Sequence, residues 1–105
     1  MSDGTRVGAK DDTGKVRFSL LQWDSIGEML KVLEHGAKTY APEGWRLVDN
    51  ARQRYYDALM RHVTAWWMGE ENDPQTGLHH LGHAMCNVSF LLALDLAKRA
   101  AFSKS

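Results

Sequence analysis

The chain has 105 residues, enough for one small domain, and its 13 basic side chains balance its 13 acidic ones. This balance argues against direct binding of nucleic acid or of an anionic membrane surface. The single cysteine excludes an internal disulfide framework, and no apolar run approaches the roughly 20 residues that span a bilayer. We therefore expect a soluble protein of the cytoplasm with no membrane contact.

The amino-terminal segment mixes glycine, charged and turn-forming residues with almost no apolar periodicity. Residues 1–18 are therefore predicted to form an irregular arm, ordered only where something docks it. Residues 19–105 are predicted to form a single all-α domain. In this part apolar residues recur at helical spacing, and no strand-like alternation of useful length appears.

The first of three predicted helices covers about residues 25–40. The stretch SIGE has the form of a capping box, in which Ser25 caps the helix and Glu28 lies three residues on. The helix should end before Pro42. The proline and glycine of APEGWRLVDN then predict a loop that reaches Asn50.

The second and third helices are predicted at about residues 50–70 and 74–101. Asn50 can cap the second helix, which has an apolar stripe at helical spacing. That stripe consists of Tyr55, Leu59, Val63 and Trp66. Asp73 followed by Pro74 predicts the start of the third helix, with the aspartate at the N-cap and the proline at the first helical position. Asp73 could also bind a ligand while it caps.

Apolar residues occupy more than one face of the second and third predicted helices. The chain also has four tryptophans, which a three-helix monomer cannot all cover. Exposed apolar patches of this kind usually mark an interface. We therefore expect a small helical bundle that is completed by homo-oligomerisation, as a homodimer or a homotetramer.

Polar and ionisable side chains concentrate between residues 61 and 87. If the second helix extends a turn past Gly69, three of them lie along one side of it: His62, Glu70 and Asp73. The third helix carries three more on one face, at a spacing of i, i+3 and i+7: His80, His83 and Asn87. The junction of the two helices therefore predicts a polar pocket.

Gathered carboxylates suit Mg²⁺ or Mn²⁺, and histidines can complete a Mn²⁺ site or donate to phosphate oxygens. The candidate metal ligands are Glu70, Glu71, Asp73 and His83. The competing interpretation is that the acids are solvated at a helix end and the histidines only stabilise the fold. A zinc site made by His79, His83 and Cys86 has helical spacing but lacks a CxxC or HExxH pattern, so it is not favoured.

Three stretches carry a resemblance to a known family: KDDTGKVRFSLL, GAKTYAPEGWR and YYDALMRHVTAWWMGEENDPQTGLHHLGHAMCNVSFLL. Over residues 10–92 the chain resembles the phage family of dATP/dGTP diphosphohydrolase N-terminal domains. That family's pattern includes Arg-His, Gly-Glu-x-x-Asp and His-x-x-His-Ala-x-x-Asn. The resemblance implies kinship with the MazG-like all-α pyrophosphatases, which use divalent metal to split a nucleoside triphosphate into monophosphate and pyrophosphate.

The resemblance implies metal-assisted hydrolysis of a purine deoxynucleoside triphosphate, with Mg²⁺ or Mn²⁺ as the cofactor. The location would be the host cytoplasm if a phage encodes the chain. The side chains expected to act in catalysis are Glu70, Asp73, His80 and His83. Those expected to bind the nucleotide, through phosphate charge or by stacking on the base, are Lys15, Arg17, Lys38, Tyr40, Trp45, Arg61, His62, Trp66 and Asn87.

The chain departs from the MazG-like pattern in its first helix. Those enzymes typically show Glu-x-x-Glu there, whereas this helix offers Glu28 and Glu34, six residues apart. A second departure lies after Asp73-Pro74, where Gln75 stands in place of an expected acid. The alternative function is a non-catalytic phage nucleotide sponge that sequesters a defence signal. A third hypothesis is a helical assembly or DNA-accessory protein, although the lack of a basic stripe argues against direct DNA binding.

Overall fold

The computed structural model describes residues 10–104. Three α-helices follow one another: α1 (Trp23–Thr39), α2 (Ala51–Trp67) and α3 (His80–Lys104). Short 3₁₀ turns precede the first two, η1 at Phe18–Leu20 and η2 at Gly44–Leu47. No strand forms in the described part of the chain, where one isolated bridge joins Asn72 to His79. The predicted all-α fold of three main helices is confirmed.

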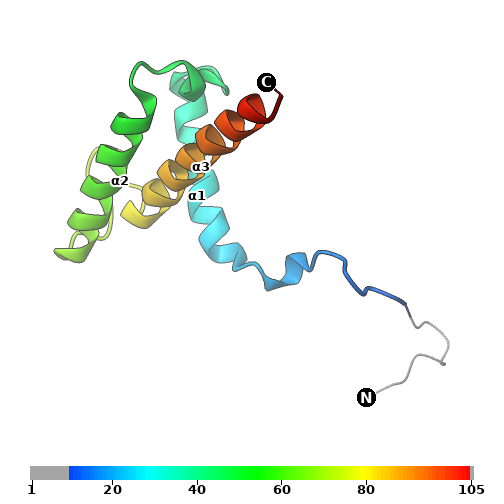
Figure 1. The fold of residues 1–105 in the computed structure, drawn as a ribbon. Coiled ribbons are helices and arrows are strands. Elements are labelled where there is room, and N and C mark those ends of the chain that lie inside the picture. Colours follow the sequence, from blue (N-terminus) through cyan, green and yellow to red (C-terminus); the bar gives the residue numbers. More distant parts are fainter. Residues whose placement is uncertain (1–9, 105) are drawn as a thin grey trace.

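The third helix holds the other two together. It packs against α2 and, over a smaller interface, against α1 (Figure 1). At the crossing with α1, a Cβ atom built on Gly82 would lie 3.0 Å from the carbonyl oxygen of Glu28, so only glycine allows this approach without a shift. One turn further along α3, the Cys86 Sγ donates to the carbonyl oxygen of Met29 at 3.3 Å.

The start of α1 differs from the prediction. The helix begins at Trp23 with Gln22 at the N-cap, and no side chain caps it. The carbonyl oxygen of Gln22 already accepts the N–H of Ile26, so Ser25 lies inside the first turn and cannot cap. Glu28 pairs with Lys31 instead, at 2.7 Å. The predicted capping box is therefore wrong.

The second helix is shorter than predicted. Asn50 does precede its first residue, in the left-handed conformation (φ 53°) that asparagine tolerates, but its side chain makes no capping hydrogen bond. The helix ends at Trp67, because Gly69 adopts a φ of 105° that a helix does not allow. The extension past Gly69 is therefore wrong.

The third helix begins at His80, six residues later than predicted. A tight turn replaces the expected first turn of helix, because the backbone of Asp73 donates to Leu78 at 2.8 Å and accepts from Gly77 at 2.7 Å. The Asp73 Oδ1 accepts the N–H of Gln75 at 3.1 Å, which closes the turn from the side. The interpretation of this aspartate as a helix N-cap is therefore wrong.

The buried positions of the described chain all lie in the first two turns of α3. They are His80, Gly82, Ala84, Cys86 and Asn87. No described side chain is fully buried, and many large apolar side chains of α2 and the later turns of α3 are exposed. No helix in residues 10–104 is long and apolar enough to cross a membrane.

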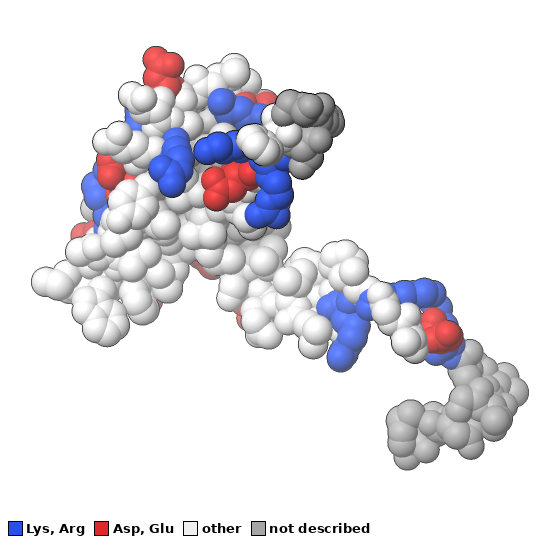
Figure 2. All heavy atoms as spheres, in the orientation of Figure 1, with Lys and Arg blue, Asp and Glu red and all other residues white. Residues whose placement is uncertain are grey.

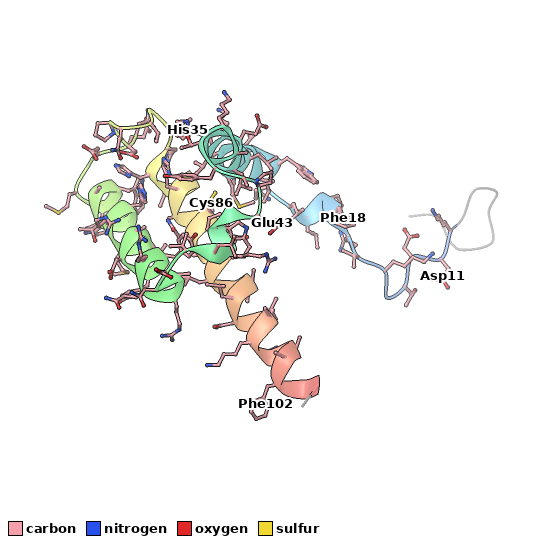
Figure 3. All side chains as sticks on the ribbon, turned by 90° about the horizontal axis from the view of Figure 1, so that it is seen from above. Asp11, Phe18, His35, Glu43, Cys86 and Phe102 are labelled. Atoms are coloured by element: carbon pink, nitrogen blue, oxygen red, sulfur yellow. The ribbon has the colours of Figure 1, made fainter. Side chains whose placement is uncertain are left out.

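The segment before α1 runs away from the three helices (Figures 1 and 3). Within residues 10–22 the regular structure is the single turn η1, and Phe18 and Leu20 expose most of their surface. The rest of the predicted arm, residues 1–9, lies outside the described residues.

Candidate functional site

The connection between α2 and α3 folds back across the start of α3. The N–H of His80 donates to the carbonyl oxygen of Glu71 at 2.9 Å, and the turn at Asp73 brings its carboxylate to the same side. Two acids of the connection thereby reach the histidines of the two helices. A longer α2 was expected to bring these side chains together, whereas the loop between the two helices does so.

Three imidazole rings lie against one another at this junction. The rings of His62 and His83 are stacked, with centroids 4.4 Å apart and planes 2° apart. The Nδ1 atoms of His62 and His80 lie 2.8 Å apart, so one of them donates to the other. The rings of His62 and His80 are tilted, with centroids 5.1 Å apart. His62 is therefore held from two sides by α3.

His80 links this group to Glu70. Its Nε2 lies 2.6 Å from Glu70 Oε1, and a carboxylate can only accept, so the Nε2–H of His80 donates. The His80 side chain is 5% exposed, whereas the Glu70 side chain is 51% exposed. One end of this hydrogen-bonded chain is therefore open to solvent and the other lies among the histidines.

His83 meets the turn through Thr76 and Asp73. The Thr76 Oγ1 lies 2.7 Å from His83 Nε2 and 3.4 Å from Asp73 Oδ2, and it accepts the N–H of Leu78 at 3.2 Å. His83 Nε2 and Asp73 Oδ2 are 3.5 Å apart. The amide of Asn87 donates to the carbonyl oxygen of His83 at 3.0 Å, so this predicted site residue stabilises the backbone below the cluster.

Burial keeps two of the imidazoles neutral. It lowers the pKa of His62 to about 4, with a further lowering by His83 that outweighs the opposing charge of Asp73. The pKa of His83 is also lowered, mainly by burial, while Asp73 opposes the shift. At neutral pH each ring therefore keeps one nitrogen with a free lone pair, the form that binds metal.

The side chains of His62, Asp73 and His83 could hold a metal ion. Each offers one ligand atom, and these atoms all lie within 4.8 Å of one another. In the described part of the chain no other group of three such residues comes together. Of the remaining predicted ligands, Glu70 is bonded to His80, and the side chain of Glu71 is exposed outside the group.

The geometry does not support a zinc site made by His79, His83 and Cys86. His79 Nδ1 accepts the N–H of Leu81 at 3.0 Å, and the Cys86 thiol donates to α1. Burial raises the pKa of Cys86 to about 11, which disfavours the thiolate that zinc requires. In Figure 3 Cys86 lies in the middle of the three helices.

A cavity of about 630 Å³ adjoins the histidines and runs between α1, η2, α2 and α3. Six of the predicted site residues line it: Tyr40, Trp45, Arg61, His62, His83 and Asn87. His62 and His83 thus belong both to the cavity wall and to the group that could hold a metal ion. A bound molecule in this cavity would therefore lie next to such an ion.

Trp45 has neighbours on both faces of its ring. Phe90 stacks on one face, with centroids 4.6 Å apart, so the Arg46 guanidinium, 4.4 Å from the ring centre, covers the other. The Tyr55 hydroxyl donates to the carbonyl oxygen of Trp45 at 2.7 Å. Tyr40, by contrast, exposes most of its surface at the cavity.

Four of the predicted nucleotide-binding residues do not line the cavity. Lys15 and Arg17 lie on the segment that runs away from the helices, and Lys38 is exposed near the end of α1. Trp66 lies against Trp67, with ring centroids 6.0 Å apart. Figure 2 shows other basic side chains gathered where α1 ends, α2 begins and α3 ends.

Sequence reasoning missed four residues of the site. They are Arg54, Tyr55, Thr76 and Phe90. Arg54 precedes Arg61 by two helical turns, so a search along that face of α2 would have found it. Thr76 follows Asp73 in the stretch DPQTG, which is typical of a turn closed by side chains.

The fold and the site define a small all-α domain with a histidine–carboxylate group at one end of a cavity lined by aromatic and arginine side chains. The family model dATP/dGTP diphosphohydrolase, N-terminal, matches residues 5–103, so the chain belongs to that family and the predicted resemblance is confirmed. It is 33% identical over 88 residues to the dATP/dGTP diphosphohydrolase of Salmonella phage PMBT28. That match covers 84% of this chain and 30% of the phage protein. No solved structure matches.

Proposed function

We propose that this chain hydrolyses a purine deoxynucleoside triphosphate to the monophosphate and pyrophosphate, with a divalent metal ion as cofactor. The observation that carries the proposal is the position of His62 and His83, which line the cavity and also belong to the group that could hold the ion. The name of the phage relative supports the substrate class, although this chain spans only 30% of that protein.

The length of the cavity suits a nucleotide. His83 and Phe90 both line it and are seven residues apart on α3, which corresponds to about 10 Å along the helix. The triphosphate would lie at the His83 end, where Arg61 also lines the wall and can balance phosphate charge. The base would lie near Tyr40, whose ring is exposed, with Trp45 as part of the wall.

The reaction adds one water to the triphosphate. The oxygen of that water bonds to the α-phosphorus, the bond from this phosphorus to the bridging oxygen breaks, and pyrophosphate leaves with that oxygen. A divalent ion, when bound, supplies charge for the phosphate oxygens and a more acidic water. His62, Asp73 and His83 would hold it, and the Glu70–His80 pair would orient the ring of His62.

Kinship with MazG-like enzymes is part of the proposal, with a different set of ligands. On α1 the acid Glu28 pairs with Lys31, and no described acid of that helix belongs to the group that could hold a metal ion. Imidazoles of α2 and α3 would take their place. The reaction would occur in the cytoplasm, where nucleoside triphosphates are found.

The test is incubation of the chain with each deoxynucleoside triphosphate in the presence of Mg²⁺ or Mn²⁺, followed by chromatography of the products. Release of monophosphate and pyrophosphate from dATP or dGTP is expected. A nucleotide that is retained intact would reject hydrolysis and favour the sponge. The sponge is the second candidate because the group that could hold a metal contains a single carboxylate, while the cavity has arginine and aromatic walls.

We also propose that a second copy of this chain covers the exposed apolar side chains of α2 and α3, as a homodimer or homotetramer. The accessible surface of 8715 Å² exceeds the about 6,000 Å² of a compact monomer of this length. The extended amino-terminal segment accounts for part of the excess. A groove of about 710 Å³, lined mainly by apolar side chains such as Leu59, Val63, Val88 and Leu92, lies on this surface.

The second copy is the occupant because the chain has so little interior of its own. No described side chain is fully buried, and a stable protein needs more apolar burial than α3 provides here. If the folded chain always needs a partner on its apolar groove, a second copy of the same chain is the simplest partner, because it is present whenever the chain is. Near the end of α2, Figure 2 shows a surface with few charged side chains.

A further inference from the structure

We infer that His62, His83 and Asp73 form a site that prefers a transition-metal ion to Mg²⁺, and that Glu70 and His80 are positioning residues that aim the Nε2 of His62 at the ion. The inference concerns the same group as the proposed function. It rests on that proposal only for the use of the ion, since binding can be measured without nucleotide.

The hydrogen-bonded chain determines which nitrogen of His62 is free. Glu70 can only accept, so His80 donates from Nε2, and its Nδ1 is left to accept. His62 must then donate from its own Nδ1, which lies 2.8 Å from the Nδ1 of His80. The lone pair of His62 is therefore on Nε2. A carboxylate that acts through a histidine in this way is a common device behind metal ligands.

The orientation of the His62 ring is restrained as well as its tautomer. His80 is 4% exposed, so water has little access to the hydrogen bond between the two rings. The ring of His83 lies parallel to that of His62, within 2°, at a centroid distance of 4.4 Å. Because the lone pair of an imidazole nitrogen lies in the plane of its ring, two parallel rings cannot both aim at one ion. The hydrogen bond to His80 holds His62, so the ring of His83 must tilt when an ion binds.

The other two ligand atoms already lie close to a bonding arrangement. His83 Nε2 and Asp73 Oδ2 are 3.5 Å apart, and ligands around an ion with bonds of about 2.1 Å lie roughly 3.0–3.4 Å apart. Thr76 Oγ1 lies near both atoms, at 2.7 and 3.4 Å. Its hydroxyl can rotate, so the ion can replace the contact that Thr76 makes with His83.

The donor set decides the kind of ion. Two imidazole nitrogens and one carboxylate suit Mn²⁺, Co²⁺, Fe²⁺ or Zn²⁺, and this combination leaves positions for water and phosphate. Mg²⁺ prefers oxygen ligands and is usually bound through carboxylates and phosphates. The group contains one carboxylate, because Glu70 is engaged by His80 and Glu71 lies outside it.

The test is a metal titration of the chelator-treated protein without nucleotide. Calorimetry with Mn²⁺, Zn²⁺ and Mg²⁺ should give one ion per chain and an affinity for Mn²⁺ and Zn²⁺ at least tenfold above that for Mg²⁺. Co²⁺ should develop the visible absorption bands of imidazole coordination. His62→Ala should remove both signals. Equal affinity for Mg²⁺ and Mn²⁺, or no binding of any transition metal, would overturn the inference.

The positioning role needs a separate set of variants. Glu70→Ala should weaken Mn²⁺ binding by about 10–100-fold, and Glu70→Gln should weaken it less, since its amide oxygen still accepts from His80. Glu34→Ala, an exposed acid on α1, is the control and should bind as the parent does. Glu70 is half exposed, so these variants should keep the parent's melting curve in the presence of chelator. Parental affinity in Glu70→Ala would reject the role of the pair.

Outcomes for the ion and for the reaction are separable. A protein that binds Mn²⁺ through His62 but releases no pyrophosphate supports this inference and rejects the proposed hydrolysis. A protein that hydrolyses nucleotide with Mg²⁺, and whose His62→Ala variant binds metal unchanged, supports the reaction and rejects this site.

Discussion

The two halves of α3 differ in what surrounds them. Residues 80–87 contain every buried position of the described chain, and their polar groups find partners in α1, α2 and the preceding loop. Residues 88–102 have no buried position, and Val88, Leu92 and Leu96 expose between 47% and 55% of their surface. The chain thus assembles its candidate site from its own residues and leaves apolar surface exposed on the same helix.

The largest effect is expected at the candidate site, which the first half of α3 shares with the preceding loop, and it concerns catalysis. Asp73→Asn should lower pyrophosphate release by roughly 100–1,000-fold, because a metal site is worth several kcal/mol of transition-state stabilisation. Asparagine can accept the N–H of Gln75 as aspartate does, so the turn and the melting temperature of the metal-free protein should be kept. Glu34→Gln is the control. An Asp73→Asn variant with the parent's rate would show that His62, Asp73 and His83 only stabilise the fold.

The reactivity of the Cys86 thiol measures how well the first half of α3 is protected from solvent. Burial raises the pKa of Cys86 from 9.0 to about 11, which lowers the thiolate fraction at pH 8 by roughly 100-fold. An aromatic disulfide reagent should therefore modify the folded protein at least about 100-fold more slowly than the protein unfolded in guanidinium. Equal rates would mean that the first half of α3 opens readily and is no better protected from solvent than the second half.

The second half should respond through assembly. Leu92→Glu puts a charge in the wall of the apolar groove, where burial without a partner costs at least about 2 kcal/mol, or roughly 30-fold in the dissociation constant. Light scattering at micromolar concentration should show an oligomer for the parent and a smaller species for the variant. Lys98→Glu adds the same side chain on another face of the helix and should leave the mass unchanged. A monomeric parent with a cooperative melt would contradict the proposed second copy.

The crossing of α1 with the first half of α3 should tolerate little added volume. Gly82→Ala brings a methyl group to 3.0 Å from the Glu28 carbonyl oxygen, and the resulting backbone shift should cost about 1–3 kcal/mol in the free energy of unfolding. In Gly27→Ala, the matched control on α1, no atom lies within 4 Å of the new methyl group, so this variant should gain about 0.5–1 kcal/mol. Denaturant unfolding measures both. Equal stabilities would place the crossing further apart than described.

The smallest effect is expected outside both halves. Ser25 lies inside the first turn of α1 and caps nothing, so Ser25→Ala should change the free energy of unfolding by less than about 0.5 kcal/mol. The loss of a true N-cap would cost about 1 kcal/mol. The same unfolding experiment distinguishes the two values, and the larger one would restore the capping box.

Several features follow from the sequence alone because they depend on local spacing. Apolar recurrence at helical intervals is a property of each segment, so it located the three helices, and the motifs around Arg61, Glu70 and His80 indicated the family. The i, i+3 relation of His80 and His83 follows from helix geometry and needs no tertiary contact. Helix ends were less accurate, because backbone hydrogen bonds and not residue types decided where α1 and α3 begin.

The tertiary structure alone decided which of these residues meet. Sequence spacing aligned Glu70 with Asp73 as ligands, whereas the turn closed by Thr76 directs Asp73 to His83 and leaves Glu70 to His80. His62 joins the group because α2 packs beside the start of α3. Such contacts depend on how a loop folds back and how two helices cross. These are long-range properties, to which many residues contribute a little and which no single motif encodes.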